Sequence, residues 1–301
     1  MKQDIQWPKK TRELKHCIMD STIWNDFNFR DDDIIVATWQ KSGTTWLQQI
    51  IAQLVFQGKT EGIPISEVSP WVDMRLPPPE LRPDLDLQTH RRFLKTHLPA
   101  DALVYSPKAK YVYIARDGRD CLWSLYNHHH SLTPELYEAL KSLPNIAPVF
   151  EPPEIDNPRE YFLAWLKDQS PWWSFWESVR TFWGIRELPN MYLLHFQNLK
   201  DDLEGEMRRL AHYLNITIDE SMWEQMVYQS SFEFMKKDGA AVPLGGAIFK
   251  GGVDSFIHKG GNNRWRDALS SEDVAAYEER ALHELGPECA HWLETGEMQT
   301  K

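Results

Sequence analysis

Three short segments of the sequence carry side chains that are suited to binding anions and to moving a proton. The first is Thr38–Trp46, T-W-Q-K-S-G-T-T-W, which lies between a predicted strand and a predicted helix. Backbone N–H groups and the helix dipole favour an anion at such a junction. Gly43 lets the backbone approach a phosphate, and Lys41 adds a mobile positive charge. Further hydroxyl donors are provided by Ser42, Thr44 and Thr45.

This segment is not a Walker A loop. That motif needs Gly directly before Lys and a second Gly five positions earlier, whereas Gly43 is followed by Thr44 and position 38 is Thr. The segment is also compatible with a helix that begins after a turn and is capped by Ser or Thr. Taken alone, it therefore leaves an anion site and a simple helix start as alternatives.

The second segment is Tyr111–Ser124, in which Arg116 follows a predicted strand and Ser124 lies eight residues further along the chain. Ligands bind at the carboxyl ends of the strands in open α/β sheets. Eight residues span about two helical turns, so the guanidinium and the hydroxyl could jointly hold a second phosphate. Arg119 is also compatible with an ion pair to the neighbouring Asp residues at the surface.

The third segment, Lys95–Pro99, places a lysine and His97 at the end of another predicted strand. On the same sheet edge as two anion sites, a neutral imidazole could take a proton from a hydroxyl near pH 7.

No metal site is expected at His128–His130, because consecutive helix positions point in different directions and no carboxylate or Cys partner stands at ligand spacing.

A scaffold must bring these segments together, and the sequence pattern predicts one. Short apolar runs predict strands at Asp33–Trp39, Phe93–Thr96, Lys110–Ala115 and Met191–Phe196. Apolar periodicity and end signals predict helices at Thr44–Gln57, Asp117–His130, Pro158–Lys167, Pro171–Trp183, Leu199–Leu214, Ser221–Gln229 and Ser271–Leu285. Strands that alternate with helices predict an α/β fold with a mostly parallel central sheet flanked by helices on both faces.

Three stretches lack such periodicity. Ile63–Asp86 predicts a loop with one short helix, and the Pro-rich Leu132–Arg159 predicts an insertion or lid. The Gly-rich Lys237–Asn263 predicts a long mobile loop. No repeat and no linker divides the sequence, so a single domain is expected over residues 1–301, with its core over roughly 30–295.

The composition is that of a globular protein with an acidic balance. The chain has 33 Lys and Arg against 44 Asp and Glu, a formal charge of −11, so neither nucleic acid nor an anionic membrane surface is an expected partner. Hydrophobic residues at 42% argue against disorder. The 14 Trp residues are expected mainly in the core, with several lining a pocket for a flat or apolar substrate.

The cysteines and the apolar runs indicate the cellular compartment in which the protein is expected. Cys17, Cys121 and Cys289 are far apart and form no C-x-x-C pair, which favours reduced thiols and a cytoplasmic location. The first twenty or so residues contain no apolar signal segment, and no run approaches about 18 apolar residues. Secretion and membrane spanning are therefore not expected.

In this order, the three segments resemble the cytosolic-type sulfotransferases that use 3′-phosphoadenosine 5′-phosphosulfate (PAPS). In that family K-S-G-T-T-W binds the 5′-phosphosulfate, K-T-H-L-P supplies the catalytic histidine, and an Arg with a Ser eight residues later binds the 3′-phosphate. The resemblance implies catalytic roles for His97, Lys41 and Lys95. It also implies that the cofactor PAPS is held by Lys41, Ser42, Gly43, Thr44, Thr45, Trp46, Arg116, Ser124, Ser230, Phe232, His258, Lys259 and Gly260.

Later segments extend the resemblance over roughly residues 30 to 295. Ser230–Phe232 is similar to the segment near the adenine, and Lys259–Gly260, followed by Trp265, is similar to the loop that closes over the 3′-phosphate. The bacterial branch of the family is indicated by Pro171–Trp173, Leu194–Phe196 and Leu244–Gly246.

The sequence also departs from the family pattern. His258 stands where many members have Arg, which implies weaker binding of the 3′-phosphate at neutral pH. Phe196 replaces a Tyr that contacts the nucleotide in many members, so that role is not transferred. The K-x-x-x-T-V-x-x-x-E dimer motif of animal members is absent around Arg266–Ala276, and the oligomeric state stays open.

The resemblance implies in-line transfer of a sulfuryl group from PAPS to a hydroxyl, or to an amine, of a small-molecule acceptor. His97 would be the general base, Lys41 would stabilise charge on the bridging oxygen, and Lys95 would orient the sulfonate. Besides the Gly-rich loop Leu244–Gly252, the expected acceptor pocket consists of Trp71, Asp73, Met74, Tyr126, His129, Trp172 and Trp173. Their aromatic content favours a phenol or an extended apolar alcohol.

Two other functions fit parts of the sequence. A P-loop-like small-molecule kinase would use the same strand–loop–helix, but the Walker A order and an obvious magnesium-binding pair are missing. A non-catalytic nucleotide-binding protein would use the same anion sites, but it has no need of His97.

Overall fold

Four short parallel strands form the centre of the molecule. The computed structural model describes residues 5–77, 82, 84–143, 151–169, 172–238, 242, 246–257 and 259–298. The strands are β1 (Ile34–Thr38), β2 (Phe93–Thr96), β3 (Lys110–Ala115) and β4 (Met191–His195), in the order β2-β1-β3-β4. Because all three pairings are parallel, the carboxyl ends of the strands meet at one edge of the sheet.

Both faces of the sheet are buried, which explains why the strands are apolar runs without polar alternation. Ile34 and Val36 of β1 belong to one hydrophobic core and pack with helices α1 (Thr44–Phe56), α8 (Leu203–Leu214) and α9 (Trp223–Gln229). Ile35 and Ala37 point to a second core. That core contains residues of α3 (Gly118–Ser131), α5 (Pro158–Asp168), α6 (Phe175–Gly184) and α12 (Ser271–Thr295).

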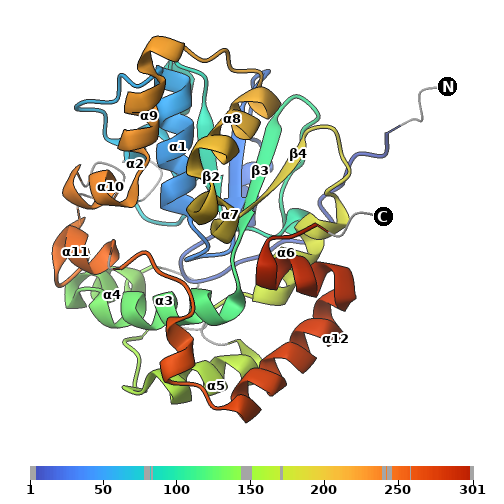
Figure 1. Ribbon diagram of the computed structural model, residues 1–301, viewed down its shortest axis with the longest axis vertical. Helices are drawn as coiled ribbons and strands as arrows, with labels where there is room; N and C mark the ends of the chain where they lie inside the picture. The colour runs from blue at the N-terminus through green and yellow to red at the C-terminus, as the bar shows by residue number, and fades with distance from the viewer. Residues whose placement is uncertain are drawn as a thin grey trace.

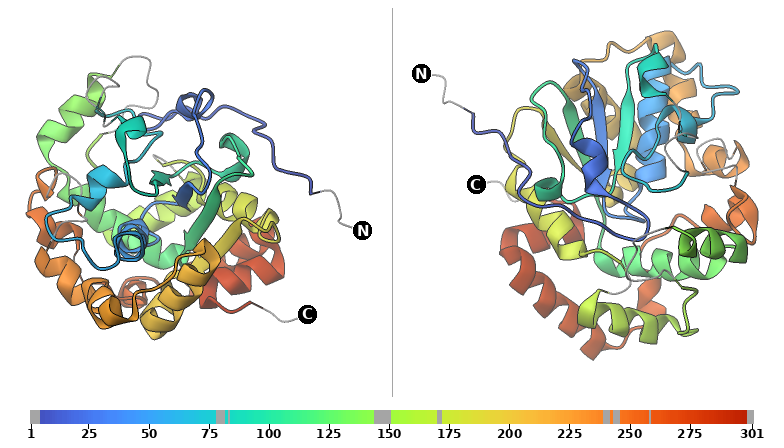
Figure 2. Two further views of the ribbon diagram at one scale, coloured as in Figure 1. Left: turned by 90° about the horizontal axis from the view of Figure 1, so that it is seen from above. Right: turned by 180° about the vertical axis from the view of Figure 1, so that it is seen from behind.

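The two groups of helices lie on opposite sides of the strands. Figure 1 shows α1, α8 and α9 beside the strands and α3, α5 and α12 below them. The view from behind in Figure 2 shows the same separation. The α/β fold class with a parallel sheet flanked by helices is therefore confirmed. No helix in the described part of the chain is both long and apolar enough to cross a membrane.

Several helices differ from the predicted ones in their bounds or were not predicted at all. The predicted helix Leu199–Leu214 is broken at Asp202, whose carboxylate accepts from Gly205 N–H and caps α8. Helix α12 continues beyond Leu285 to Thr295 across a kink at Gly286, where φ is 73°. Unpredicted helices are α4 (Pro134–Lys141), α7 (Phe196–Asp201), α10 (Phe232–Asp238) and α11 (Gly252–Phe256), while α2 (Ile65–Val68) is the expected short helix.

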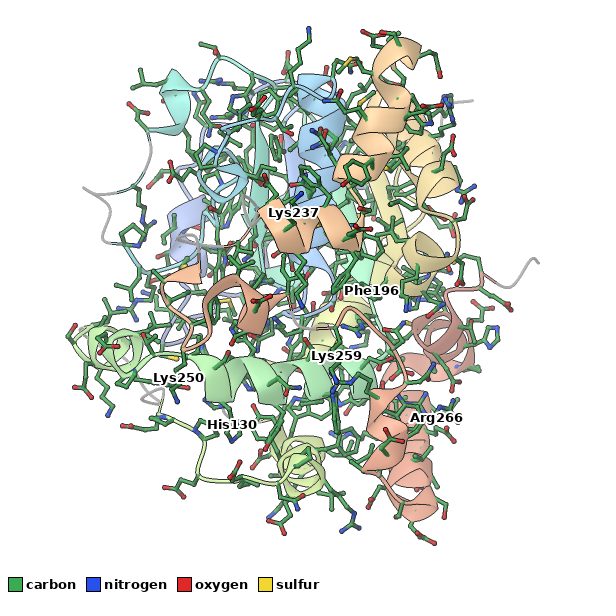
Figure 3. All side chains as sticks on the ribbon, turned by 60° about the vertical axis from the view of Figure 1, so that its left-hand side comes forward. His130, Phe196, Lys237, Lys250, Lys259 and Arg266 are labelled. Atoms are coloured by element: carbon green, nitrogen blue, oxygen red, sulfur yellow. The ribbon has the colours of Figure 1, made fainter. Side chains whose placement is uncertain are left out.

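The stretch predicted to be an insertion packs against the Gly-rich segment near the end of α3. Leu132 forms an antiparallel bridge with Phe249, and Lys250 N–H donates to the carbonyl of Ser131 at 2.7 Å. Lys250 Nζ also donates to the carbonyl of His130 at 3.1 Å, and Figure 3 shows both residues at this end of α3. These contacts hold residues 246–257 over the carboxyl edge of the sheet.

Candidate active site

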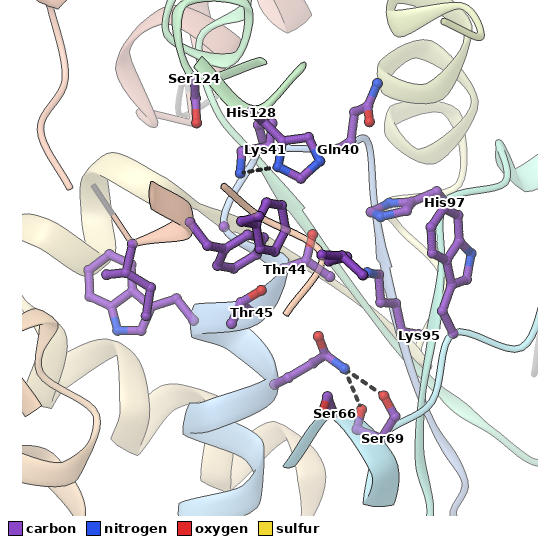
Figure 4. Close-up of a pocket in the computed structure, with 18 of the residues that line it drawn as sticks. Gln40, Lys41, Thr44, Thr45, Ser66, Ser69, Lys95, His97, Ser124 and His128 are labelled. Atoms are coloured by element: carbon purple, nitrogen blue, oxygen red, sulfur yellow. Dashed lines mark hydrogen bonds between the residues drawn. The ribbon is translucent and has the colours of Figure 1, made fainter. Parts of the chain in front are cut away.

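One cavity of about 1220 Å³ opens at the carboxyl ends of β1, β2 and β3. Pockets for one small molecule are typically about 300–1,000 Å³, so this volume suits two ligands side by side. The three sequence segments singled out for chemistry all reach it, through Lys41, Lys95 and His97, and Arg116. Figure 4 shows Lys41 on one side of the cavity and Lys95 and His97 on another.

The loop between β1 and α1 is shaped to present backbone N–H groups. Lys41 and Gly43 adopt positive φ values of 63° and 112°. Gly43 is the N-cap of α1, and no described side chain caps its first turn, which leaves those N–H groups available to an anion. A Cβ on Gly43 would lie 2.8 Å from Phe196 and 2.9 Å from Ile114, so only glycine fits.

Lys41 is a half-buried cation without an acidic partner among its described contacts. Its Nζ lies 3.4 Å from Nδ1 of His128 and 4.4 Å from the centre of the Phe256 ring. Burial, followed by the charges of Arg116 and Lys95, lowers the pKa of Lys41 to about 7. Such a group gains its full charge only when an anion enters the cavity.

Lys95 faces the same cavity from β2. Its Nζ lies 4.6 Å from the centre of the Trp71 ring. Burial lowers the pKa of Lys95 to about 8, although the charge of nearby Asp73 acts in the opposite direction. Asp73 is fully buried and accepts hydrogen bonds from Trp71 Nε1 at 2.7 Å and Trp24 Nε1 at 3.0 Å. Asp73 therefore orients Trp71 and balances part of the charge of Lys95.

His97 has a fixed tautomer. Its Nδ1 lies 2.7 Å from the carbonyl oxygen of Thr38, which can only accept, so Nδ1 carries the proton and Nε2 carries the lone pair. The ring is 4% exposed and meets the Trp71 ring edge-on at 4.6 Å. Burial, with the charges of Lys95 and Lys41, lowers the pKa of His97 well below 6.5. His97 is thus a neutral hydrogen-bond acceptor at neutral pH.

Arg116 connects the loop between β1 and α1 to the Gly-rich segment. Its guanidinium donates to the carbonyl of Gly261 at 3.0 Å, to Asn262 Oδ1 at 2.9 Å and to the carbonyl of Lys41 at 3.3 Å. Three of its five N–H groups are used in this way. Ser124, two turns along α3, lines the cavity as well.

The segment after α11 forms another wall. Lys259 and Gly260 line the cavity beside Phe232, and a Cβ on Gly260 would lie 2.5 Å from the Phe232 ring. Figure 3 shows Lys259 above α3, on the same side of the molecule as Phe196. His258 lies outside the described residues, as do Leu244 and Gly245 of the loop predicted at the acceptor pocket.

The structure brings most of the predicted cofactor residues to the cavity but not all of their side chains. Those that line it are Lys41, Gly43, Thr44, Thr45, Trp46, Arg116, Ser124, Phe232, Lys259 and Gly260. Ser42 is not among the described lining residues, and its hydroxyl lies 3.4 Å from Cys121 Sγ. Ser230 is fully buried; its hydroxyl donates to Met226, and its carbonyl accepts from Trp46 Nε1 at 2.7 Å.

The predicted acceptor pocket needs revision. Trp71, Met74 and Trp172 line the cavity, whereas Asp73, Tyr126, His129 and Trp173 are not among its described lining residues. Tyr126 donates to Asp156 at 3.1 Å, and His129 is buried against Tyr161 and the carbonyl of Glu151. For Tyr126 and His129, sequence position alone could not exclude the pocket, because neighbouring positions of α3 face different surroundings.

The apolar walls come from two distant parts of the chain. One wall contains Ile18, Ile23, Phe27, Trp71, Met74 and Leu85. The other contains Leu132, Leu136, Leu140, Ile248, Phe249 and Phe256, from the predicted insertion and the Gly-rich segment.

Two further cavity residues were missed in the sequence. His128 lies four residues after Ser124, a spacing that places both on one face of α3 and that could have revealed it. Gln40, directly before Lys41, also lines the cavity. The three consecutive histidines diverge, since His128 contacts Lys41, His129 contacts Tyr161, and His130 Nδ1 lies 2.8 Å from a backbone carbonyl.

Solved structures with the same fold include retinol dehydratase in complex with androsterone and the inactive cofactor PAP. Its TM-score is 0.68 at 23% identity, covering 87% of this chain and 83% of that chain. Mouse sulfotransferase SULT7A1 complexed with PAP has a TM-score of 0.62 at 19% identity, covering 87% of each chain. At these identities the likeness shows a shared fold.

Sequence relatives cover nearly the whole chain. A glycolipid sulfotransferase from Mycobacterium bovis (strain BCG / Pasteur 1173P2) is 28% identical over 96% of this chain and 96% of its own length. Human sulfotransferase 1C2 is 24% identical over 84% of this chain and 83% of its own length. The Sulfotransferase domain family matches residues 31–286, a span that contains every described strand and all the cations around the cavity. This chain therefore belongs to the sulfotransferase family, whose members take the sulfuryl group from PAPS.

Proposed function

We propose that the protein transfers the sulfuryl group of PAPS to a hydroxyl of an extended apolar acceptor, with His97 as general base. The observation that carries this proposal is the hydrogen bond from His97 Nδ1 to the carbonyl of Thr38. It leaves an unprotonated Nε2 on a residue that lines the same cavity as Lys41, Lys95 and Arg116. A neutral base and several cations at one strand edge suit the transfer of an anionic group.

The residues present fit an anionic donor with two phosphate-type groups. Three features indicate a site that would bind an anion. They are the uncapped start of α1, the closely packed Gly43 and the lowered pKa of Lys41. Thr44 and Thr45 line the cavity at this point. Arg116, Ser124 and Lys259 supply a second group of donors for the 3′-phosphate.

PAPS, when bound, supplies a sulfuryl group that carries one negative charge fewer than a phosphoryl group, so protein cations can act where kinases need magnesium. Lys41 stabilises negative charge on the bridging oxygen as its bond to sulfur breaks. Lys95 orients the sulfonate from the opposite wall. His97 Nε2 accepts the proton of the acceptor hydroxyl while that oxygen bonds to sulfur, so charge and protons balance.

The walls of the cavity support an acceptor with a long or bulky apolar body. Aromatic and aliphatic side chains cover both ends, and the acidic net charge of the chain favours no polyanionic acceptor. The name of the mycobacterial relatives, glycolipid sulfotransferase, is consistent with an amphiphilic alcohol.

The test is mass detection of sulfated product from PAPS and a panel of long-chain alcohols, alkylphenols and alkyl glycosides. With the best acceptor, His97→Ala should lose about 10²–10⁴ in kcat. Its affinity for PAP (3′,5′-ADP) should stay near that of the parent, because a neutral imidazole adds little to anion binding.

A matched control is His195→Asn, which removes another buried imidazole that does not line this cavity. Its rate should stay near the parent value. An aliphatic alcohol must be used, because an acidic phenol ionises without a base. Near-normal turnover by His97→Ala would remove His97 from the mechanism.

A further inference from the structure

Gln40 is a buried amide in the cavity without a hydrogen-bond partner. The residue is 7% exposed, and its Nε2 has no partner among the described residues. It directly precedes Lys41 and lines the same cavity. A buried amide that makes no hydrogen bond is unfavourable by roughly 1–3 kcal/mol, so native proteins rarely leave one without a reason.

Other amides in the cavity behave differently. Gln48 Nε2 donates to the carbonyl and the hydroxyl of Ser69, at 2.6 and 2.9 Å. Asn127 Nδ2 donates to the carbonyl of Trp123 at 2.7 Å. The amide nitrogens of Gln48 and Asn127 are therefore bonded within the protein, whereas the amide nitrogen of Gln40 has no partner among the described residues.

His128 presents a second unused polar atom. When a bound anion keeps Lys41 protonated, its ammonium can only donate, so the 3.4 Å contact with His128 Nδ1 leaves the ring proton on Nε2. Within the described residues no group is bonded to that Nε2. His128 is thus an N–H donor, the opposite of His97, whose Nε2 is an acceptor.

Both unused groups belong to residues that line the same cavity as Lys41 and His97. Gln40 adjoins Lys41 in the chain, and His128 adjoins it through the 3.4 Å contact. In the view of Figure 4, Gln40 is drawn between His128 and His97. A ligand group that binds them would therefore lie in the same cavity as the hydroxyl that reacts. A simple alcohol or phenol has no such group.

We propose that the preferred acceptor carries a second hydroxyl next to the one that is sulfated, as in a vicinal diol, a catechol or a sugar-type polyol head, and that Gln40 and His128 bind it. This inference rests on the proposed function and narrows its substrate class. A hydroxyl both donates and accepts, so it can accept from His128 Nε2–H and exchange hydrogen bonds with the Gln40 amide. The apolar walls hold the rest of the molecule.

The test compares two acceptors that differ by one hydroxyl: decyl alcohol and the vicinal diol with the same chain. The parent enzyme should favour the diol by about tenfold or more in kcat/KM, the value of at least one net hydrogen bond. Gln40→Leu and His128→Phe should each reduce this preference several-fold. Tyr126→Phe also removes a polar atom from α3, but one bonded to Asp156 outside the cavity, so its preference should equal that of the parent.

A second readout does not depend on turnover. Calorimetric titration of each acceptor into protein saturated with PAP should show tighter binding of the diol, and this difference should shrink in Gln40→Leu and in His128→Phe. PAP affinity and melting temperature establish that each variant is folded. If one variant does not fold, the other still decides the question.

The outcomes separate this inference from the proposed function. Equal kcat/KM for the two acceptors in a parent enzyme that binds PAP and sulfates both would overturn the inference alone. A preference for the diol that both variants keep would also overturn the assignment to Gln40 and His128. Failure to bind PAP or to sulfate any alcohol would defeat the proposed function and the inference together.

Discussion

At the scale of single residues, the site contains one cation, Lys41, that has no acidic partner among its described contacts. Lys41 has a histidine and a phenylalanine as its closest partners, and Arg116 binds backbone carbonyls and an amide. The charged form of Lys41 is less stable here than it would be in water, and a bound anion removes that penalty. Binding of the donor should therefore be coupled to proton uptake.

The pKa of Lys41, lowered by burial to about 7, predicts the sign of this coupling. Above pH 7.5 the free enzyme is mostly neutral at Lys41, while an adjacent phosphate raises the pKa, so PAP binding takes up a proton. Affinity for PAP should then fall with rising pH between about 7.5 and 9, by up to tenfold per pH unit.

Calorimetry in buffers of different ionisation enthalpy measures this uptake directly. Lys41→Met should bind PAP more weakly, with most of the proton uptake gone; what is left would come from Lys95, whose pKa burial lowers to about 8. Proton uptake that is identical in the parent and in Lys41→Met would show that another group titrates.

At the scale of elements, the strand–loop–helix from β1 to α1 depends on one glycine. Gly43→Ala should destabilise the fold by roughly 1–3 kcal/mol, because Ala is strained at φ 112° and its Cβ would contact Phe196 and Ile114. The loop must shift to relieve that contact, so PAP affinity should fall by more than tenfold.

Chemical denaturation and PAP titration check both effects. Gly184→Ala, at the end of α6, is the matched control, since its Cβ would meet no atom within 4 Å. That variant should be as stable as the parent or slightly more stable. A Gly43→Ala protein with parental affinity for PAP would mean that the backbone of this loop does not bind the donor.

The Gly-rich segment was predicted to be a mobile loop, and its described part contains α11 and contacts on α3. Arg116 also holds it through Gly261 and Asn262. Because Lys259 lines the cavity, a bound 3′-phosphate should tighten the segment, and amides within 246–257 and 259–263 should exchange more slowly with PAP. Hydrogen exchange with and without PAP decides this, and unchanged protection there would contradict it.

At the scale of the whole molecule, His195 joins the sheet to the last helix. Its Nε2–H donates to the carbonyl of Leu293 in α12 at 3.0 Å, and its Nδ1 accepts from Gln197 N–H at the start of α7. The bond from Gln197 N–H needs an unprotonated Nδ1, whereas the bond to Leu293 survives protonation of the ring. Burial lowers the pKa of His195 to about 4. Acid should therefore break the bond to the start of α7 and place a buried charge between the sheet and α12.

The sign of the effect follows from the lowered pKa. The unfolded chain binds the proton near pH 6.5 and the folded protein near 4, so stability falls as the pH drops through this window, by about 1.4 kcal/mol per unit from this residue. His195→Asn keeps an acceptor for Gln197 but does not titrate. Urea unfolding between pH 7 and 4.5 should give a shallower slope for that variant, and identical slopes would exclude this role.

Much of the fold could be predicted because its signals are local. Buried parallel strands are apolar runs, and all four predicted strands are confirmed within about a residue or two at each end. The loop between β1 and α1 could also be recognised in the sequence, since a strand, a Gly-containing turn and a helix follow one another directly. The family, the enzyme class and the donor PAPS, predicted from three motifs, are confirmed by the family match.

The tertiary structure decided what depends on contacts between distant segments. Nothing near Asp73 in the sequence shows that Trp24, 49 residues away, donates to its carboxylate. Nothing near Gln40 shows that its amide nitrogen has no partner among the described residues. Helix α4 and residues 246–257 become cavity walls only because they pack against α3. Periodicity indicates which face of a helix or strand is buried. The residues that pack on that face, and therefore the pKa and the chemistry of its side chains, are set by the packing of the whole chain.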